Sequence, residues 1–401
     1  MNFSNTPIIH VSFLQKSKPL SVGRLILKDR KIFFEYSLDF LKTGIELSPF
    51  KLPLKAGLIL CEDRLFEGLF GVFNDSLPDG WGRLLLDRKL MSLGINPHAP
   101  SPLDRLGYVG SHGMGALIYE PEIESSTPLP HKNFDEIAEE AKQFQENNND
   151  TFVDDLLTLN RSSAGARPKI LVNINGEDWI VKFQSSSDPK DVGPIEYAYH
   201  LMAKKAHLDV PEAKLFPSKK GPGYFGVKRF DRIENQRLHM HTVSGLLHAD
   251  HRIPSLDYQT IMKAALWLTK DHRACEKLFR MAVFNVLCYN RDDHAKNFSF
   301  LMDQEGKWSI SPAYDLTFSS GPAGEHCSTI MGEGKNPTAI HLLKLAKLVD
   351  IKKETALKIL EEVKNATTDW NVFAKNVGVS PTSAKTIDNA ILNQGKLFRF
   401  P

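Results

Sequence analysis

The sequence predicts an α+β fold with two lobes, the first rich in β-strands and the second mostly helical. Three observations favour this fold class. Apolar and polar residues alternate through 8–60, as they do in half-buried strands. Asn175-Gly176 separates two short apolar runs, which is a strong signal for a β-hairpin. From Tyr258 onward helical spacing dominates, apart from a second predicted hairpin at 298–311.

Size and charge limit the classes of function. A chain of 401 residues is long enough for two or three subdomains with cores of their own. Its 50 basic residues are balanced by 48 acidic ones, so a general nucleic-acid or membrane-surface binder is not indicated. The four cysteines form no CxxC pair, and Cys275 and Cys288, in or beside a predicted buried helix, are expected to be core thiols in a reducing compartment. The chain opens without a secretory signal and has no apolar run of membrane-spanning length, so we expect a cytoplasmic protein without membrane contact.

The N-terminal part of the chain is expected to form a subdomain of its own. Strands are predicted within 8–60, and a turn-rich segment then leads into a helix at 79–94. Residues 120–150 are polar and acidic, which is typical of a linker and a solvated helix. We therefore predict three domains: an N-terminal subdomain at 1–120, an N-lobe at 121–245 and a helical C-lobe at 246–401.

The predicted N-lobe combines a loop of small residues with a lysine at the end of a strand. The loop "RSSAGARPK" at 161–169 precedes two strands around the Asn-Gly turn, and the second strand ends at Lys182. A predicted helix at 193–208 carries Glu196, and 224–232 is typical of a further strand. Small residues allow backbone N–H groups to approach phosphate oxygens. This lobe is therefore expected to hold phosphate groups.

The polar run "YNRDDHAKNFSF" directly follows an apolar helix. Residues 278–289 are apolar on nearly every face, which predicts a helix buried in a core. Polar groups at the end of such a helix are costly unless they have a function. Asp292 is followed five residues later by Asn297, then by the second hairpin and by Asp315.

This order is the layout that protein kinases use for phosphoryl transfer. An Asp orients the acceptor hydroxyl, an Asn five residues later binds metal, and a second Asp beyond a short hairpin binds Mg²⁺. Mg²⁺ prefers oxygen ligands and neutralises charge on the transferred phosphoryl group. Lys182 and Glu196 stand in the order of the phosphate-binding lysine and its carboxylate partner, although a solvated helix charge is the alternative for Glu196. A lone D-x-x-x-x-N is a weak signal, and the ordered set is a stronger one.

Three departures exclude an ordinary eukaryotic-type kinase. Asp315 is followed by Leu-Thr instead of Phe-Gly, and Asn290 stands where the usual motif has His. The loop at 161–169 is neither a Walker A motif nor G-x-G-x-x-G.

At these residues the sequence resembles the HipA family, bacterial serine/threonine kinases that act as toxins of toxin–antitoxin pairs. The matching segments are "FGVFNDSLPDGWGRLLLDR", "SSAGARPK", "VKF", "YFGVKRFDR", "NRDDHAKNFSF" and "SPAYDL". They span nearly the whole chain in family order. The resemblance implies a HipA-like, phosphoinositide-3/4-kinase-like fold, with an elaborated β-rich N-lobe and a helical C-lobe.

The resemblance also implies roles for individual residues. Asp292 would be the catalytic base, Asn297 and Asp315 the Mg²⁺ ligands, and Lys182 the residue on the nucleotide phosphates. The serine of the small-residue loop that becomes autophosphorylated and silences the enzyme would be Ser162, with Ser163 as the neighbouring alternative. Further nucleotide contacts would come from Gly165, Ala166, Lys228, Phe230, His294 and Tyr314.

Some residues have a second interpretation. Asp293 is expected to face solvent or to support the catalytic loop. His294 either packs this loop or lies near the nucleotide, and Phe230 suits the core as well as an adenine contact. A metal-hydrolase cluster at 292–294 is disfavoured, because no second set of ligands accompanies it.

A group of histidines raises the question of a zinc site. Residues two apart on a strand share a face, but no cysteine or acidic residue has a spacing that suits a shared metal site with these histidines. We expect them in a surface loop near the active cleft. They are His239, His241, His248 and His251.

The sequence thus predicts an ATP- and Mg²⁺-dependent protein serine/threonine kinase of HipA type. By resemblance, its substrate would be an aminoacyl-tRNA synthetase, glutamyl first, and its partner a HipB-like helix-turn-helix antitoxin through which it would reach DNA only indirectly. The alternative is a catalytically silent kinase-fold regulator that binds an antitoxin and DNA. The presence of Asp292, Asn297 and Asp315 argues against that alternative.

Overall fold

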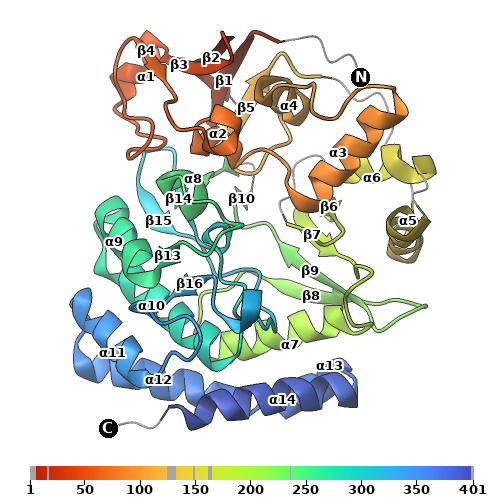
Figure 1. The fold of residues 1–401 in the computed structure, drawn as a ribbon, viewed down its shortest axis with the longest axis vertical. Coiled ribbons are helices and arrows are strands. Elements are labelled where there is room, and N and C mark those ends of the chain that lie inside the picture. The colour runs from red at the N-terminus through yellow and green to blue at the C-terminus, as the bar shows by residue number, and fades with distance from the viewer. Residues whose placement is uncertain are drawn as a thin grey trace. The chain divides into compact units, whose positions relative to one another are not determined.

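The structure is a computed structural model, and it describes residues 6–15, 18–123, 132–147, 150–160, 165–234 and 236–398. The chain divides into two compact units, and Figure 1 labels most of their helices and strands. The first unit takes residues 1–188, 228–248 and 301–307, and the second takes 189–227, 249–300 and 308–401. Each unit is therefore built from separate stretches of the chain. The domain boundaries near 120 and 245 remain predictions.

The first unit combines strands with short helices. Its strands are β1 (Ile8–Gln15), β2 (Lys18–Lys28), β3 (Lys31–Tyr36), β4 (Leu58–Leu60), β5 (Leu117–Glu120), β6 (Lys169–Ile174), β7 (Glu177–Lys182), β10 (Arg232–Ile233), β11 (Gln236–Arg237) and β12 (His239–Thr242). Its helices are α1 (Leu38–Thr43), α2 (Gly71–Asn74), α3 (Gly80–Ser92), α4 (Pro102–Val109), α5 (Phe134–Asn147), α6 (Val153–Leu159) and α8 (Val243–Leu247).

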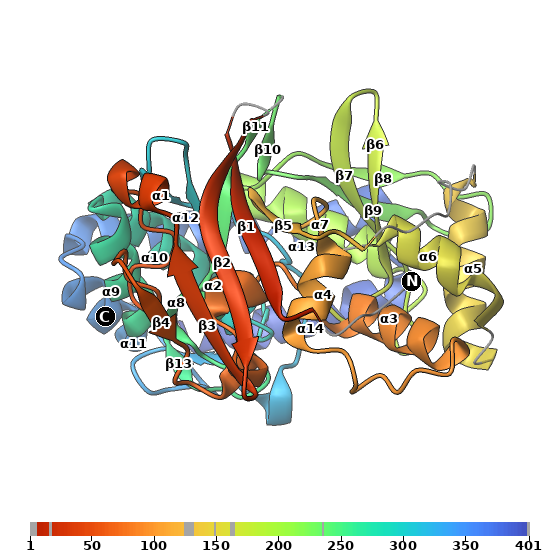
Figure 2. The ribbon, with the colours of Figure 1, turned by 90° about the horizontal axis from the view of Figure 1, so that it is seen from above.

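A five-stranded antiparallel sheet forms the N-terminal part of this unit, in the order β4-β3-β2-β1-β5. Figure 2 shows its red strands β1, β2 and β3 side by side. On β3, Ile32, Phe34 and Tyr36 are buried and the residues between them are not, as expected for a strand with one face on a core. The strands predicted within 8–60 are therefore confirmed.

Helix α3 confirms the helix predicted at 79–94, and it packs against two neighbours. Trp81 of α3 meets Phe144 of α5 edge to face, with ring centroids 5.4 Å apart. Lys89 pairs with Asp154 of α6 at 2.6 Å. The helix predicted in the acidic segment 120–150 is thus present as α5, but it is not solvated on every side, because Phe144 and the residues one turn before it are buried.

The hairpin predicted from the Asn-Gly pair is confirmed by β6 and β7, which are antiparallel. Asn175 and Gly176 have φ values of 55° and 85°, the left-handed conformation that a two-residue hairpin turn requires. Trp179 and Val181 are buried on β7, and Lys182 is its last residue.

The second unit is mainly helical. Its helices are α7 (Val192–Lys205), α9 (Tyr258–Thr269), α10 (His272–Leu287), α11 (Ala339–Leu348), α12 (Lys353–Thr367), α13 (Trp370–Val377) and α14 (Pro381–Lys396). Its strands include β8 (Ala213–Phe216), β9 (Tyr224–Lys228), β13 (Leu256–Asp257) and β16 (Ser328–Thr329). The short elements around the polar run are a 3-10 turn at Ala295–Asn297, then β14 (Ser299–Met302) and β15 (Trp308–Ile310).

Helix α10 forms the centre of the second unit. Every residue from Met281 to Cys288 is buried, and the helix packs against α9, α11, α12 and α14. The hydroxyl of Tyr199 on α7 donates to the carbonyl of Cys288 at 2.6 Å, which ties the end of α10 to α7. The predicted buried helix is therefore confirmed.

Residues 339–367 form two helices, α11 and α12, because the chain turns at Asp350 with φ 57°. None of the helices in the described residues is long and apolar enough to cross a membrane.

Candidate functional site

The loop after α10 is held by hydrogen bonds before it reaches Asp292. The side-chain amide of Asn290 donates to Asn285 Oδ1 at 2.9 Å, and its backbone N–H donates to the Asn285 carbonyl at the same distance. The buried guanidinium of Arg291 donates to the carbonyls of Gly324 and Lys335. The loop is thus anchored to the buried helix and to the segment 324–335.

The structure brings Asp292 and Asn297 together. Asn297 is buried, and its Nδ2 donates to the backbone carbonyl of Asp292 at 2.7 Å. That bond uses the amide nitrogen, so the amide oxygen is the atom that can serve a ligand. Asp292 is exposed, and the Cys327 thiol lies 3.8 Å from its Oδ1. Burial, followed by the charge of Asp292, raises the pKa of Cys327 to about 12, so this thiol stays protonated at neutral pH.

Asp293 is buried and accepts hydrogen bonds at both carboxylate oxygens. Its Oδ2 accepts from the Tyr258 hydroxyl at 2.9 Å and from His326 Nδ1 at 2.8 Å, and its Oδ1 accepts from the Ser328 N–H at 3.2 Å. The Ser328 hydroxyl donates to the Asp293 carbonyl at 2.7 Å. The expectation that this residue faces solvent is wrong, and the alternative of a supporting residue describes what it does. Burial, followed by this carboxylate, raises the pKa of Tyr258 well above its usual range.

His294 and Tyr314 both form hydrogen bonds to the backbone of Lys296. The Nδ1 of His294 accepts from the Lys296 N–H at 3.2 Å, and the ring lies 5.7 Å from that of His251. The Tyr314 hydroxyl donates to the Lys296 carbonyl at 2.5 Å. His294 therefore packs the loop, and its place near a nucleotide remains a prediction, as does that of Tyr314.

Asp315 has a strained backbone. Its φ of 57° is left-handed, which a side chain other than glycine rarely adopts and which occurs often at functional sites. Tyr314 beside it is bonded to the preceding loop, and Ser319 exchanges backbone hydrogen bonds with Tyr289 and Arg291 at 3.0 and 3.2 Å. The segment that carries Asp315 thus runs along the loop described above.

In the first unit, the base of the small-residue loop is attached to the start of α3. The Gly165 N–H donates to the Asp79 carboxylate, and the Gly165 carbonyl accepts from the Trp81 N–H at 2.9 Å. Gly80 lies between them with φ 44°, and a Cβ there would lie 2.5 Å from the Gly165 carbonyl oxygen. Gly80, the first glycine of the "PDGWGR" segment, is therefore required for this close approach. Ala166 is exposed, while Ser162 and Ser163 lie outside the described residues.

Lys182 has a neighbour that the sequence reasoning missed. Lys169 pairs directly with Lys182 across the hairpin, so both side chains lie on the same face of β6 and β7. Lys169 is buried, and its Nζ would lie 2.5 Å from a Cβ at Gly165. Two ammonium groups on one face, one of them at the base of the small-residue loop, favour an anionic ligand there. The signal in the sequence was the equal spacing of both lysines from the Asn-Gly turn.

The structure describes the surroundings of three other predicted residues. Glu196 is buried on α7, so the alternative of a solvated helix charge is wrong; its pairing with Lys182 remains a prediction. Lys228 pairs with Glu177 at 2.5 Å, both partly exposed. Phe230 is half-buried, which leaves both of its interpretations open.

The segment around Phe230 contains a buried charge network. Asp231 accepts from Arg229 at 2.8 Å, from Arg232 at 2.6 Å and from the Gly115 N–H at 2.7 Å. Despite burial, the two guanidinium groups hold the pKa of Asp231 well below its usual range. The segment from Arg229 to Arg232 is thus fixed to the N-terminal part of the first unit.

The expectation that the four histidines form a surface loop is wrong. His239 and His241 are fully buried on β12, where they bond to the Leu47 carbonyl at 3.1 Å and to Asp75 at 2.6 Å respectively. His248 bonds to Asp63 at 3.1 Å and accepts from the Gly71 N–H at 3.0 Å. The acidic partners are more than 160 positions away in the sequence, which is why local spacing did not reveal them.

His251 belongs to the second unit, whereas the other three histidines belong to the first. In the described part of the chain, no group of three or more His, Cys, Asp or Glu side chains is placed to hold a metal ion.

Comparisons with known proteins place the chain in a family. The family model "HipA-like C-terminal domain" matches residues 161–370, more than half of the chain, and "HipA N-terminal domain" matches residues 17–120. A Sinorhizobium fredii protein named "Putative kinase Y4dM" is 27% identical over 53% of this chain and 56% of its own. A Haemophilus influenzae "Putative kinase" is 26% identical over 39% of this chain and 52% of its own. The chain thus spans about half the length of the curated relatives it matches.

Among solved structures, the HipA toxin of Shewanella oneidensis, solved with HipB and operator DNA, is similar in fold. The TM-score is 0.72 at 17% identity, over 97% of both chains. The predicted α+β fold of HipA type is therefore confirmed.

Proposed function

The chain belongs to the HipA family, and from that premise we propose that it is an ATP- and Mg²⁺-dependent protein serine/threonine kinase. One observation carries the proposal most strongly. Of two adjacent carboxylates, Asp293 is buried in hydrogen bonds, whereas Asp292 is exposed on a backbone that Asn297 holds. Asp293 is therefore suited to support the loop, and Asp292 is suited to contact a substrate.

The residues present fit magnesium and nucleotide phosphates. Asn297 can offer its amide oxygen and Asp315 a carboxylate, and oxygen ligands of this kind suit Mg²⁺. Lys169 and Lys182 supply positive charge on one face of a hairpin. Bound ATP would supply the phosphoryl group, and the Mg²⁺ bound with it would neutralise part of the phosphate charge.

In this proposal Asp292 orients the acceptor hydroxyl and accepts its proton at a carboxylate oxygen. Asn297 keeps the Asp292 backbone in place through the 2.7 Å bond, and Asp293 anchors the loop to Tyr258 and His326. Removing the base should therefore lower turnover, and removing a metal ligand should lower affinity.

Calorimetric titration of Mg-ATP tests this division of roles. Wild type should bind, Asp292→Ala should bind with similar affinity, and Asp315→Ala should bind more than about tenfold more weakly, because a lost charged ligand costs more than 1.4 kcal/mol. A wild-type protein that does not bind Mg-ATP would favour the silent-regulator alternative.

We further propose that the protein acts as a toxin with a HipB-like antitoxin and reaches DNA only through it. The Shewanella relative was solved with HipB and operator DNA, and the net charge of +2 offers this chain little attraction for DNA of its own. Wild type should arrest growth when expressed alone, and the adjacent small open reading frame should relieve the arrest. Equal arrest by Asp292→Ala would show that harm does not come from phosphorylation.

For the substrate we propose an aminoacyl-tRNA synthetase, glutamyl first, on the family resemblance alone. For self-regulation we propose autophosphorylation at Ser162 or Ser163, next to the loop base that Asp79 holds at Gly165. Both proposals are tested by incubating wild type or Asp292→Ala with ATP and glutamyl-tRNA synthetase and mapping the phosphopeptides of both proteins. Phosphate on neither serine in the wild-type protein would contradict the self-regulation.

A further inference from the structure

The segment from Ser319 to Lys335 lies against the loop that carries Asp292, within the second unit. Its first residue exchanges backbone hydrogen bonds with that loop, and the Cys327 N–H donates to the Arg291 carbonyl at 3.0 Å. The Cys327 thiol lies 3.8 Å from Asp292 Oδ1. A molecule that reaches the exposed Asp292 carboxylate therefore also meets the 319–335 segment.

The backbone of the 319–335 segment is strained at several points. Gly321, Ala323 and Met331 have φ values of 69°, 52° and 55°, which are left-handed. Ala323 and Met331 carry side chains, and residues with a side chain rarely adopt this conformation. Such a backbone persists only where its surroundings hold it in place. The segment therefore needs support from the residues packed against it.

Arg291 gives this support. Its guanidinium is buried and donates from Nη1 to the Gly324 carbonyl and from Nη2 to the Lys335 carbonyl, the latter at 3.0 Å. The same group lies over the Tyr289 ring, 4.0 Å from the ring centroid, and this contact stabilises its position. A Cβ at Gly321 would lie 2.7 Å from Arg291 Cβ, so the segment approaches the arginine closely there. One side chain thus contacts the segment near its start, in its middle and at its end.

The partners of Arg291 also bear on regulation. In kinases whose activation loop is ordered by phosphorylation, an arginine pairs with the added phosphate. Here both terminal nitrogens of the Arg291 guanidinium already donate to carbonyls of the chain itself. The planar guanidinium can serve two acceptors at once in a fixed geometry, which the single ammonium group of a lysine does not reproduce. The 319–335 segment is therefore held in place without a phosphate.

We propose that Arg291 is a positioning residue, which holds the 319–335 segment as the surface on which a protein acceptor lies. The acceptor chain would contact this segment while its hydroxyl meets Asp292, and no activating phosphorylation would be required. Because Arg291 is buried, it acts through the segment and not by contact with the acceptor. The acceptor role rests on the proposed kinase function, whereas the support of the segment does not.

Transfer kinetics of Arg291→Lys test the acceptor role, with labelled ATP and with glutamyl-tRNA synthetase and dephosphorylated casein as separate acceptors. The variant keeps the charge but loses the paired donors. Its KM for an acceptor that wild type labels should rise about tenfold, the equivalent of one charge-assisted hydrogen bond, while its Mg-ATP affinity by calorimetry stays within about twofold of wild type. An unchanged KM for the acceptor would overturn the role. So would an equal loss of Mg-ATP affinity, because it would show a general structural effect.

Hydrogen–deuterium exchange tests the support itself, whatever the protein phosphorylates. In Arg291→Lys the amides of 319–335 should exchange about tenfold faster than in wild type, while those of α12 keep their rate. The proposal fails if exchange in 319–335 is unchanged, or if α12 changes by the same factor.

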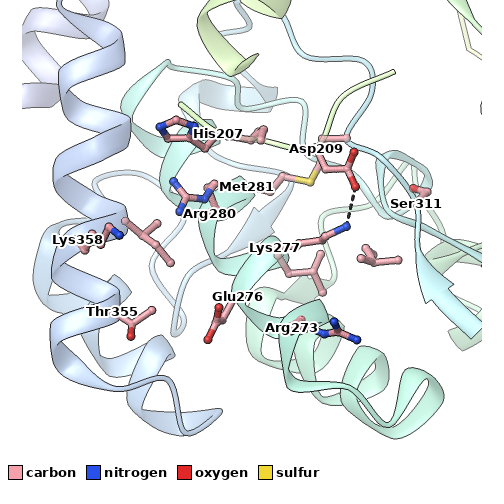
Figure 3. Close-up of a pocket in the computed structure, with 15 residues that line it drawn as sticks. His207, Asp209, Arg273, Glu276, Lys277, Arg280, Met281, Ser311, Thr355 and Lys358 are labelled. Carbon is pink, nitrogen blue, oxygen red and sulfur yellow. Dashed lines mark hydrogen bonds and ion pairs between the residues drawn. The ribbon is translucent and has the colours of Figure 1, made fainter. Parts of the chain in front are cut away.

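Arg280→Lys is the matched control. The Arg280 side chain is 18% exposed, belongs to the same unit and also donates to a backbone carbonyl, that of Ala206, at 3.0 Å. It lies in a pocket between α10 and α12, and none of the described residues that line this pocket belongs to 319–335 (Figure 3). In this control the KM for the acceptor and the exchange of the segment should both match wild type. Changes as large as those in Arg291→Lys would contradict the specific role of Arg291.

Wild-type protein that a phosphatase has stripped of phosphate tests the regulatory part. After the phosphatase is removed, transfer should begin at its full rate. A lag that prior incubation with Mg-ATP abolishes would contradict the claim that no activating phosphorylation is needed. If wild type labels no acceptor, itself included, the proposed kinase function is overturned, and the acceptor role of the segment is overturned with it.

Discussion

The loop around Asp292 and the loop base at Gly165 are fixed in opposite ways. The first depends on side chains: Asp293 accepts from Tyr258, His326 and Ser328, all of them buried. The second depends on the lack of a side chain, because Gly80 lets the backbone of α3 approach Gly165.

This difference indicates what each region tolerates. A loop held by a buried polar network is sensitive to the removal of a polar group, because its partners remain buried without hydrogen bonds. A loop held by close backbone approach is sensitive to the addition of atoms. The supporting residues of the two regions should therefore fail for opposite reasons.

The largest effect on stability is expected from Asp293→Ala. Loss of this carboxylate leaves Tyr258, His326 and Ser328 with unsatisfied buried groups, which should lower the free energy of unfolding by about 3 kcal/mol or more. Urea denaturation measures it. Asp292→Ala is the control, and its exposed side chain should change stability by less than about 1 kcal/mol. Equal effects of the two variants would remove the distinction between support and catalysis.

A smaller loss is expected from Gly80→Ala. The added methyl group would meet the Gly165 carbonyl oxygen, and the left-handed φ of 44° adds strain, so we expect about 2 kcal/mol of destabilisation. Gly94→Ala is the matched control just beyond the other end of α3: its φ is 72°, but nothing lies within 4 Å of a Cβ there. Thermal unfolding of both variants separates contact from strain. A similar loss in each would contradict the close-approach account.

Acid should weaken the first unit through His239. Burial lowers the pKa of His239 to about 3, below the ordinary value of 6.5. The unfolded chain therefore binds a proton at His239 more tightly than the folded chain does. The stability that neutral His239 contributes is fully present above pH 6.5 and is lost as the pH falls toward 3. The free energy of unfolding should drop by about 2 kcal/mol between pH 7 and pH 5. Urea denaturation at several pH values measures the slope, and His239→Gln should flatten it. An unchanged slope in that variant would exclude His239 as the titrating group.

The smallest effect on stability is expected from Lys228→Ala. Its pair with Glu177 is partly exposed, so the loss should be less than about 1 kcal/mol. The predicted nucleotide contact of Lys228 adds a second readout, a rise in KM for ATP without a loss of stability. An unchanged KM would remove Lys228 from the proposed nucleotide site.

What the sequence could predict depends on how local the signal is. The Asn-Gly hairpin, Lys182 at its end and the buried helix before Asp292 follow from short patterns, and all three are present. Asp293 had two interpretations, because its partner His326 is 33 residues away. The attachment of Gly165 to Asp79 spans 86 residues, and the bond between His241 and Asp75 spans 166, so neither was predicted.

Transfer of the γ-phosphate from labelled ATP tests the central claim most directly. Purified wild-type protein with Mg²⁺ should incorporate label into itself or into an added glutamyl-tRNA synthetase. Asp292→Asn, which keeps the size of the side chain but cannot accept the proton, should lower the rate by about 10²- to 10⁴-fold with an unchanged unfolding curve. No incorporation by wild type, or an equal rate in Asp292→Asn, would contradict the assignment of Asp292 as the catalytic base of a kinase.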